Sequence, residues 1–327
     1  MLKKLELIKI IKRKGIAIYG ELILLSQNDY GEVYGFDSNL GKLIIKVGFK
    51  EGEEAKIPGL GCHRLQNEIF FNAYLGKNKL IPKITGVGGS KAPIRYSYLL
   101  YKQTAGDNLA HLVEKNLINL PRLKAYYFSM GQKLKTIHKI KLNHFGPLGG
   151  AGKPISWYDF FSGVLDECLI HMESGEFSKN IPLLKKYIEK NISLFKEAKI
   201  IPKLLHGDYE PWNIIVKDNK IKSIIDGEFA FGGHNLIDLV PDTPSNFREA
   251  NKKILKTSFI KGYFGTKKPS EWELKCLDFY KNIKMITHRM VVWEFFTKSA
   301  GKKEALIERK KINLMLKEIK NQILYDK

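Results

Sequence analysis

One stretch of the chain places polar residues at a spacing that could support catalysis. It begins with His206-Gly-Asp-Tyr-Glu-Pro-Trp-Asn213 and ends at Asp226. Residues 214–225 contain two β-branched runs around a turn-forming segment, a pattern typical of a β-hairpin. In such a hairpin, Asn213 and Asp226 face each other across the two strands, roughly 5 Å apart. Asp208 lies in the loop that enters the hairpin, so its side chain can reach the same point.

The predicted grouping would combine one amide oxygen with two carboxylates. Such hard oxygen ligands suit Mg²⁺, which keeps some of its waters and bridges nucleotide phosphates. Asp208 would then be able to accept a proton from an attacking hydroxyl, as phosphoryl transfer requires. We therefore predict Asp208 as the catalytic base and Asn213 and Asp226 as magnesium ligands. The alternative is an ordinary hairpin whose Asp and Asn residues only cap its turns.

The rest of the chain divides into a β-rich part and a helical part. In the first hundred residues, turn-forming segments separate four β-rich runs, and one amphipathic helix is predicted before the last run. The runs are 16–25, 32–36, 42–47 and 94–101, and the helix is 64–75. Later in the chain, long amphipathic segments predict helices at 120–140, 157–172, 181–195, 275–296 and 305–324. We expect an N-terminal lobe at 1–101, a hinge at 102–106 and a helical lobe at 107–327, with a cleft between the lobes.

The motif around the hairpin resembles a known family. The H-G-D-x-x-x-x-N run, the hairpin, the Ile-Asp that ends it and Asp238 twelve residues later are similar to the aminoglycoside phosphotransferase and choline kinase families. These families share the protein-kinase-like fold. The resemblance implies an α+β fold with two lobes. The first is a small antiparallel N-lobe with one helix, and the second is a larger, mainly helical C-lobe that contains the catalytic hairpin.

The resemblance also implies roles for individual residues. Asp208 matches the catalytic base, and Asn213 and Asp226 match the magnesium ligands. His206 matches a residue that braces the catalytic loop, and Asp238 matches one that supports the loop's backbone from behind. Glu228 fits a D-x-E variant of choline-kinase-like members, in which the acid assists the metal or the substrate.

In the N-terminal part, shorter motifs resemble the nucleotide site of the family. Lys46, at the end of a predicted strand, is similar to the lysine that grips the α- and β-phosphates, and Glu68 on the following helix would be its ion-pair partner. Glu53 and Glu54 are rival partners. A solvated surface lysine is the alternative in a chain so rich in lysine.

Two further segments are similar to the places where the family contacts nucleotide. The loop at 26–34 lacks G-x-G-x-x-G, but its backbone and the side chains of Ser26 or Asn28 could hold phosphate. The run that carries Leu100 and Lys102 resembles the hinge whose backbone binds the adenine edge. We therefore predict Lys46, Glu68, Ser26, Asn28, Leu100 and Lys102 as nucleotide-binding residues.

The acceptor site is expected on the helices at 157–172 and 271–296. Both contain aromatic and acidic residues, which would suit a cationic amine through ion pairs and cation–π contacts. The alternative is that the aromatic residues belong to the core and the acids to the solvated face. The residues are Trp157, Tyr158, Asp159, Asp166, Glu167, Trp272, Glu273, His288, Trp293 and Glu294.

Composition limits the possible partners. The 327 residues are 44% hydrophobic and 27% charged, which indicates a globular chain and excludes disordered and fibrous classes. The net charge of +21 would suit nucleic acid or an anionic membrane surface. However, only seven of the 55 basic residues are arginine, and the excess is spread along the chain. We interpret the charge as a lysine-rich solvated exterior and predict no nucleic-acid partner.

Cysteine usage and hydropathy indicate the compartment. Cys62, Cys168 and Cys276 are widely separated, which fits neither a disulfide framework nor a zinc site. Charges interrupt the apolar residues at the N-terminus, so no signal peptide is predicted. No apolar run is long enough to cross a bilayer, and we predict no transmembrane segment and a cytoplasmic protein.

The function favoured by these patterns is Mg²⁺-dependent transfer of the γ-phosphoryl group of ATP or GTP to a hydroxyl of a small molecule. The resemblance points to an antibiotic acceptor, such as an aminoglycoside or a macrolide, and so to antibiotic resistance. The alternatives are a metabolite kinase for choline, ethanolamine or a sugar, and a membrane-surface glycolipid kinase. A catalytically dead nucleotide-binding protein is a third alternative, and the intact set of Asp208, Asn213 and Asp226 argues against it.

Overall fold

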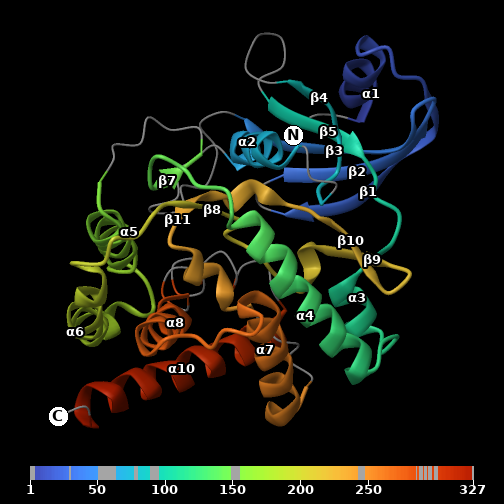
Figure 1. The fold of residues 1–327 in the computed structure, drawn as a ribbon. Helices are drawn as coiled ribbons and strands as arrows, with labels where there is room; N and C mark the ends of the chain where they lie inside the picture. The colour runs from blue at the N-terminus through green and yellow to red at the C-terminus, as the bar shows by residue number, and fades with distance from the viewer. Residues whose placement is uncertain are drawn as a thin grey trace.

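A five-stranded antiparallel sheet forms the centre of the N-terminal lobe in the computed structural model (Figure 1). The structure describes residues 4–28, 31–50, 64–76, 80–88, 96–148, 155–241, 247–284, 286, 290, 293, 297 and 301–325. The strand order is β1-β2-β3-β5-β4. The strands are β1 (Ile18–Asn28), β2 (Gly31–Ser38), β3 (Gly41–Lys50), β4 (Ile84–Gly88) and β5 (Tyr96–Lys102). All four predicted strands are present, and β4 was not predicted because its five residues include two glycines.

Helices pack against this sheet from two directions. The predicted helix is α2 (Arg64–Leu75), which lies between the sheet and the C-terminal lobe (Figure 1). A second helix, α1 (Lys4–Arg13), lies on the side away from the C-terminal lobe. It corrects the prediction of a single N-lobe helix. Its buried residues Leu7, Ile10 and Ile11 follow helical spacing and pack in one core with the inward-facing residues of β3 and β5.

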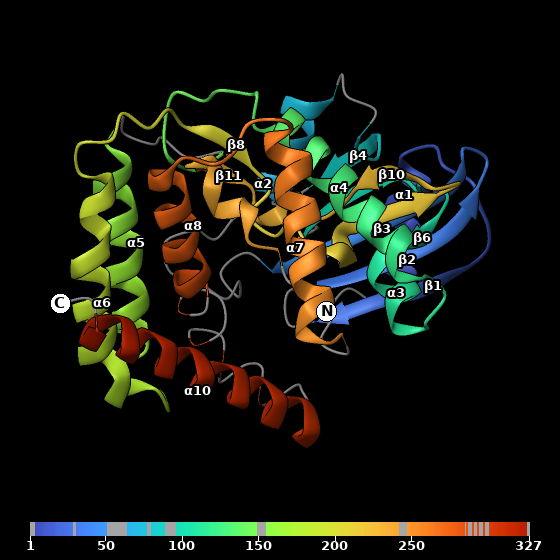
Figure 2. The same ribbon diagram turned by 60° about the horizontal axis from the view of Figure 1, so that its bottom comes forward.

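The C-terminal lobe is mainly helical, as predicted. The helices are α3 (Leu109–Glu114), α4 (Leu120–Ile137), α5 (Trp157–His171), α6 (Ile181–Ile192), α7 (Glu249–Phe264), α8 (Glu271–Lys284) and α10 (Lys302–Tyr325). Figure 2 shows α10 crossing one end of α6 at the edge of this lobe. Helix α8 ends at Lys284, so the predicted helix at 275–296 extends into residues that are only partly described.

Helix α7 was not predicted, although it packs tightly against α4. Gly131 of α4 and Gly262 of α7 lie at the crossing, where a Cβ on either residue would collide with a backbone oxygen of the other helix. The two backbones can approach this closely only because both residues lack a side chain. The α4–α7 pair forms the base on which the loop that carries Asp208 rests, because the Tyr209 hydroxyl donates to the Met130 carbonyl of α4 at 3.0 Å.

Two small sheets position the polar residues of the motif. One contains β6 (Asp107–Asn108), β9 (Ile214–Lys217) and β10 (Lys220–Ile224), in the order β10-β9-β6. The other contains β7 (Gly146–Pro147), β8 (Lys203–Leu205) and β11 (Phe231–Gly233), in the order β7-β11-β8. Strand β5 ends at Lys102 and β6 begins at Asp107, so residues 103–106 join the five-stranded sheet to the first of these small sheets.

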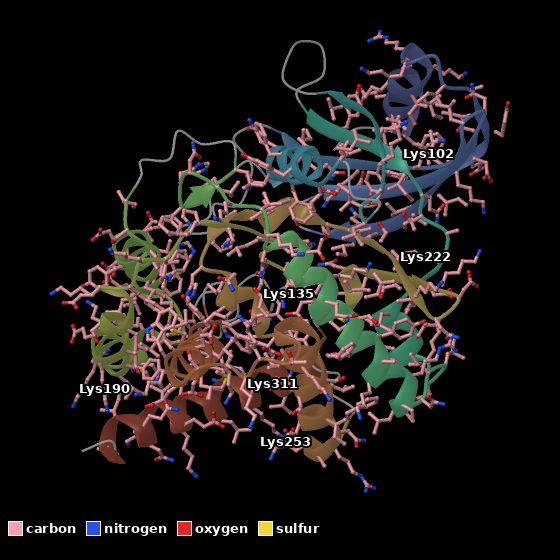
Figure 3. The ribbon with its side chains drawn as sticks, in the orientation of Figure 1. Lys102, Lys135, Lys190, Lys222, Lys253 and Lys311 are labelled. Atoms are coloured by element: carbon pink, nitrogen blue, oxygen red, sulfur yellow. The ribbon has the colours of Figure 1, made fainter. Side chains whose placement is uncertain are left out.

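Many of the lysines lie on the outside of the two lobes. Figure 3 shows labelled lysines distributed from β5 in the N-terminal lobe to α6 and α10 at the opposite end of the molecule. Within the described ranges, no helix combines the length and the apolar character needed to cross a membrane.

Candidate functional site

A cavity of about 580 Å³ lies between the N-terminal sheet and the β9–β10 hairpin. Apolar residues from both lobes form its walls, including Val33 and Ile44 of the N-terminal sheet and Ile215 and Ile225 of the hairpin region. The polar lining comes from β1, β3 and β5, from residues 103–111 and from the motif. It comprises Ser26, Lys46, Tyr101, Gln103, Thr104, Asn108, His111, Trp212, Asn213, Asp226 and Glu228.

The β9–β10 hairpin has a tight turn that fixes the position of the motif. Asp218 and Asn219 both have positive φ angles, of 51° and 58°, as the two-residue turn of a hairpin requires. The Ile225 N–H donates to the Asn213 carbonyl at 3.0 Å, so Asn213 faces Ile225 and not Asp226. The predicted pairing is therefore wrong by one residue. Asp226 follows in the left-handed region with φ 68°, and both Asn213 and Asp226 line the cavity.

Asp208 lies at the edge of the cavity, held by two neighbours. The Asn213 side-chain amide donates to the Asp208 backbone carbonyl at 2.8 Å and to Asp208 Oδ2 at 2.9 Å. The Trp212 indole N–H lies 3.5 Å from the same Oδ2 atom. Because these contacts use the amide nitrogen of Asn213, they leave Asn213 Oδ1 for another ligand. They also leave Asp208 Oδ1 without a hydrogen-bond donor from the described residues.

Asp238 holds the same loop from behind, in the role that the resemblance implied. Its side chain is 4% exposed and accepts from the backbone N–H groups of His206 at 2.7 Å and Gly207 at 3.1 Å. His138 Nε2 lies 3.2 Å from Asp238 Oδ2. Burial alone would raise the pKa of Asp238, but the hydrogen bonds and charge of His138 and His206 outweigh burial and lower it.

The His206 ring braces the loop from inside. His206 is fully buried, and its Nδ1 accepts from the Asp208 backbone N–H at 3.3 Å. The tautomer is therefore the one with a proton on Nε2, which donates to the Ile225 carbonyl at 3.0 Å. One ring thus joins the residue that precedes Asp226 to the backbone of Asp208. This contact confirms the bracing position predicted for His206.

Lys46 lies at the centre of four charged side chains, which we call the Lys46 cluster: Lys46, Glu68, Asp226 and Glu228. The Lys46 ammonium lies 3.1 Å from Glu68 Oε2 and 3.0 Å from Glu228 Oε2, and it also contacts Asp226 Oδ1. The predicted Lys46–Glu68 pair is therefore present. The rival partners Glu53 and Glu54 lie outside the described residues.

Strand alternation and helix packing assemble the Lys46 cluster. Leu43 and Ile45 of β3 point into the N-lobe core, so Ile44 and Lys46 point to the cavity. Glu68 extends from α2, whose Asn67 side chain donates to the Glu228 carbonyl at 3.3 Å. Helix α2 thus connects the two lobes beside the cluster.

The Lys46 cluster concentrates negative charge around one ammonium group. Burial lowers the pKa of Lys46, but Asp226, Glu228 and Glu68 outweigh burial and hold the pKa well above its ordinary value. Burial raises the pKa of Glu68 to about 7, and the charges of Asp226 and Glu228 add to this rise against the opposing effect of Lys46. Three carboxylates around one ammonium create an excess of negative charge that a divalent cation would neutralise.

The predicted nucleotide-binding residues have different outcomes in the structure. Ser26 lines the cavity, whereas Asn28 ends β1 and its side chain is outside the described set. Leu100 is buried in the N-lobe core because alternation along β5 turns it away from the cavity, and Lys102 is exposed. Tyr101, Gln103 and Thr104 of the same run line the cavity, and the contact of the Leu100 and Lys102 backbone with the adenine edge stays a prediction.

The predicted acceptor residues on α5 and α8 do not line the cavity. Trp157 is 1% exposed, stacks on Phe161 and donates to the Tyr280 hydroxyl at 2.9 Å. Trp272 donates to the Leu194 carbonyl at 3.1 Å, and Trp293 is buried against Glu176. These aromatic side chains form core contacts, which corrects their predicted acceptor role.

The other predicted acceptor residues that the structure describes do not line the cavity either. Asp159 is exposed and forms a cap with Ser156 at the start of α5. Asp166 and Glu167 are exposed, and Tyr158 is half-buried against the core. Glu273 caps the start of α8 by accepting from the Ser270 N–H. His288 and Glu294 lie outside the described residues.

Some residues of the cavity were missed by sequence reasoning. Trp212 lies inside the predicted motif, is 46% exposed and lies beside Asp208. The Asn108 side chain caps α3 and donates to the Trp212 carbonyl. A large aromatic residue inside a catalytic motif was the available signal for Trp212, whereas no pattern pointed to Asn108 or His111.

Comparison with protein-family models and with curated proteins finds no match. Solved structures do match over nearly the whole chain. A thermostable variant of the aminoglycoside phosphotransferase APH(4)-Ia, in a ternary complex with ADP and hygromycin B, has a TM-score of 0.66 at 15% identity. The match covers 94% of this chain and 97% of that one.

Two other structures are similar to the same extent. A candidate aminoglycoside phosphotransferase from Ralstonia eutropha has a TM-score of 0.69 at 14% identity and covers 99% of this chain and 98% of its own. A microcompartment-associated aminopropanol kinase has a TM-score of 0.67 at 12% identity and covers 98% and 97%. The fold implied by the motif is thereby confirmed: this chain has the two-lobed fold of the aminoglycoside phosphotransferases.

Proposed function

We propose that this protein is a small-molecule kinase, which transfers the γ-phosphoryl group of ATP to a hydroxyl with the help of Mg²⁺. The observation that carries this proposal is the arrangement around one cavity. Lys46, Asp226 and Glu228 of the Lys46 cluster line this cavity together with Asn213, whose side-chain amide donates to Asp208. The similarity of the fold to phosphotransferases that bind ADP supports the same interpretation.

The nucleotide would occupy the apolar part of the cavity. Ile44 and Ile215 would cover the two faces of the base, and the backbone of Gln103 and Thr104 would face its edge. Lys46 would bind the α- and β-phosphates, and Glu68 would keep the ammonium in place. ATP is the proposed donor, and GTP is the alternative because the proposed contacts to the base come from backbone groups.

The side chains of Asn213 and Asp226, which both line the cavity, fit magnesium. Asn213 offers an amide oxygen, because its amide nitrogen is used by Asp208, and Asp226 offers a carboxylate. Within the described residues, no group of three or more His, Cys, Asp or Glu side chains is arranged to hold a metal. A magnesium ion held by Asn213 and Asp226 would take its remaining ligands from water and nucleotide phosphates. When bound, Mg²⁺ would neutralise charge on the phosphates.

Asp208 would accept the proton of the acceptor hydroxyl. Asn213 and Trp212 hold Asp208 Oδ2, so Oδ1 is the atom that receives the proton. As the acceptor oxygen forms its bond to the γ-phosphorus, the bond from that phosphorus to the β-phosphate oxygen breaks. The products are the phosphorylated acceptor and ADP.

The acceptor is proposed to be an antibiotic such as an aminoglycoside. This choice follows a similar structure that holds hygromycin B. An amino alcohol is the second candidate, because another similar structure is an aminopropanol kinase. Asp226 and Glu228 line the cavity and Asp208 contacts its residue Asn213, and these carboxylates suit an acceptor that carries a protonated amine. The cytoplasm remains the proposed compartment, since it supplies both ATP and Mg²⁺.

A panel assay tests the proposal. ADP release would be measured with Mg²⁺ and ATP while aminoglycosides, macrolides, choline, ethanolamine, 1-amino-2-propanol and simple sugars are offered in turn. Acceptor-dependent release that Asp208→Ala abolishes is the expected result. Release that the variant retains, or that no acceptor stimulates, would contradict the proposal.

A further inference from the structure

We propose that Glu210 and Lys284 form a positioning pair, which holds the loop at residues 206–213 in its working geometry. This inference rests on the proposed function. Glu210 is a residue of the motif to which the resemblance assigns no role. Its carboxylate is 3% exposed and contacts the ammonium of Lys284, the last residue of α8.

The backbone of Glu210 connects the predicted base to the predicted metal ligand. Its N–H donates to the Asp208 carbonyl at 3.0 Å, and its own carbonyl accepts from the Asn213 N–H at 2.9 Å. The position of Glu210 therefore sets the spacing between Asp208 and Asn213. A displacement of this residue would move both functional side chains together.

Lys284 holds a second segment at the same time. Its ammonium donates to the Val240 carbonyl at 3.0 Å. Val240 follows Asp238, the residue that accepts from the backbone of His206 and Gly207. One side chain of α8 thus contacts both the loop that carries Asp208 and the segment that supports this loop from behind.

Burial makes this pair strong enough to act as a positioning device. An ion pair in solvent contributes little, whereas the Glu210 and Lys284 side chains are 3% and 24% exposed, so removing the ammonium would leave a buried carboxylate without this partner. Lys281, one turn earlier on α8, provides the comparison. It pairs with Glu318 at 3.3 Å, but the two side chains are 45% and 54% exposed.

The pair is expected to affect turnover and not nucleotide binding. The proposed nucleotide contacts lie on β3, α2 and the inter-lobe connection, away from α8. We expect Lys284→Met to lower kcat by about tenfold to a hundredfold, because small displacements of reacting groups have effects of this size. KM for ATP should stay within about twofold, and Lys284→Arg should restore most of the turnover.

The experiment compares Lys284→Met, Lys284→Arg and the control Lys281→Met. Hydrogen–deuterium exchange of residues 206–213 is measured first, at a temperature well below the unfolding transition of every variant. Faster exchange in Lys284→Met alone is the expected result. Exchange equal to that of Lys281→Met would overturn the proposal, and this measurement requires no activity.

Turnover is then measured with ATP, Mg²⁺ and whichever panel acceptor the wild-type protein phosphorylates. The Glu210→Gln variant provides a second test in case Lys284→Met does not fold, since it removes the charge of Glu210 and keeps the shape of the side chain. Unchanged kcat in both variants, with only a lower Tm, would show a purely structural pair and overturn the proposal. A wild-type protein without turnover would instead contradict the proposed function, while the exchange data still decide whether the pair holds the loop.

Discussion

Two regions of this molecule keep titratable side chains away from water, and they do so in opposite ways. In the Lys46 cluster, an ammonium with 14% exposure lies among three carboxylates, and it stays charged. In the C-terminal lobe, His234 is 4% exposed and lies among aromatic rings. Burial lowers the pKa of His234 to about 3, so its ring stays neutral.

The neutral region is the aromatic cluster of Trp157, Phe161, Phe195, His234 and Tyr280. Its polar atoms bind one another, because the Tyr280 hydroxyl lies 2.7 Å from His234 Nδ1 and accepts from Trp157. The charged region instead opens into a cavity where ligands can compete for its contacts. This difference shows that Trp, His and acidic residues indicate a binding site only where a ligand can reach their side chains.

The largest expected effect is the loss of turnover in Asp208→Asn. The amide cannot accept the proton of the acceptor hydroxyl, so kcat should fall by about a thousandfold. KM for ATP should change by less than about threefold, because Asp208 lies at the edge of the cavity. The variant should unfold at nearly the wild-type temperature. Steady-state kinetics check this, and a variant with a tenth or more of wild-type kcat would remove Asp208 from its proposed role.

The sequence predicted the charged region better than the neutral one. The motif between His206 and Asp238 fixes local spacing, so the hairpin and the bracing roles could be predicted from it. Lys46 and Glu68 could be paired because a strand and a helix of clear periodicity carry them. The error of one position at Asp226 arose because hairpin register depends on the turn, which short polar segments do not determine uniquely.

The sequence could not predict which side chains are buried in the core and which face the cavity. The periodicity of α5 and α8 is the same whether Trp157 and Trp272 face a cavity or a core, and only tertiary packing decides between the two. Helix α7 was missed because its buried face mixes Leu255, Phe259 and Tyr263 with Ser258 and Gly262, which weakens the hydrophobic pattern.

The second prediction compares two tryptophans, one buried in the aromatic cluster and one that lines the cavity. Trp157→Ala should lower the free energy of unfolding by about 3 to 5 kcal/mol, since it leaves a cavity in the aromatic cluster. Trp212→Ala, at a site 46% exposed, should lower it by less than about 1 kcal/mol. Urea unfolding measures both values. Equal losses in the two variants would contradict the division into core and cavity.

The same pair of variants separates stability from activity. Trp212 contacts Asp208, so Trp212→Ala should lower kcat by about threefold to tenfold although the fold is intact. Trp157→Ala should leave the kcat of the remaining folded protein unchanged. A lower kcat in Trp157→Ala, measured per folded molecule, would instead indicate that the aromatic cluster takes part in the reaction.

The third prediction concerns the charge of Lys46. Lys46→Met keeps the length of the side chain but leaves three carboxylates without this ammonium, so they should repel the phosphates of ATP. We expect KM for ATP to rise by about tenfold to a hundredfold. Lys42→Met is the matched control, because Lys42 lies on the same strand and is exposed. If both variants bind ATP equally well, the Lys46 cluster does not hold the nucleotide.

The smallest expected effect is the pH dependence that His234 adds to stability. Its folded pKa, about 3, lies below its value in the unfolded chain, which is about 6.5. The neutral ring therefore stabilises the fold fully above about pH 6.5, and this contribution is lost as the pH falls below that value. Between pH 7 and pH 5 the wild-type protein should lose about 1 to 2 kcal/mol from this residue.

His234→Gln isolates that contribution from the other acid-sensitive groups. Glutamine remains neutral across this range and can still bind the Tyr280 hydroxyl, so the variant should be less stable at pH 7 but lose less stability on acidification. Asp238 also makes the protein less stable as the pH decreases, because its pKa is lowered by folding. It is present in both proteins, and it is protonated only in a more acidic range. The difference between the two unfolding curves, and not either curve alone, therefore measures His234. Parallel curves would mean that the aromatic cluster accepts a charged ring at little cost, and the contrast with the Lys46 cluster would then disappear.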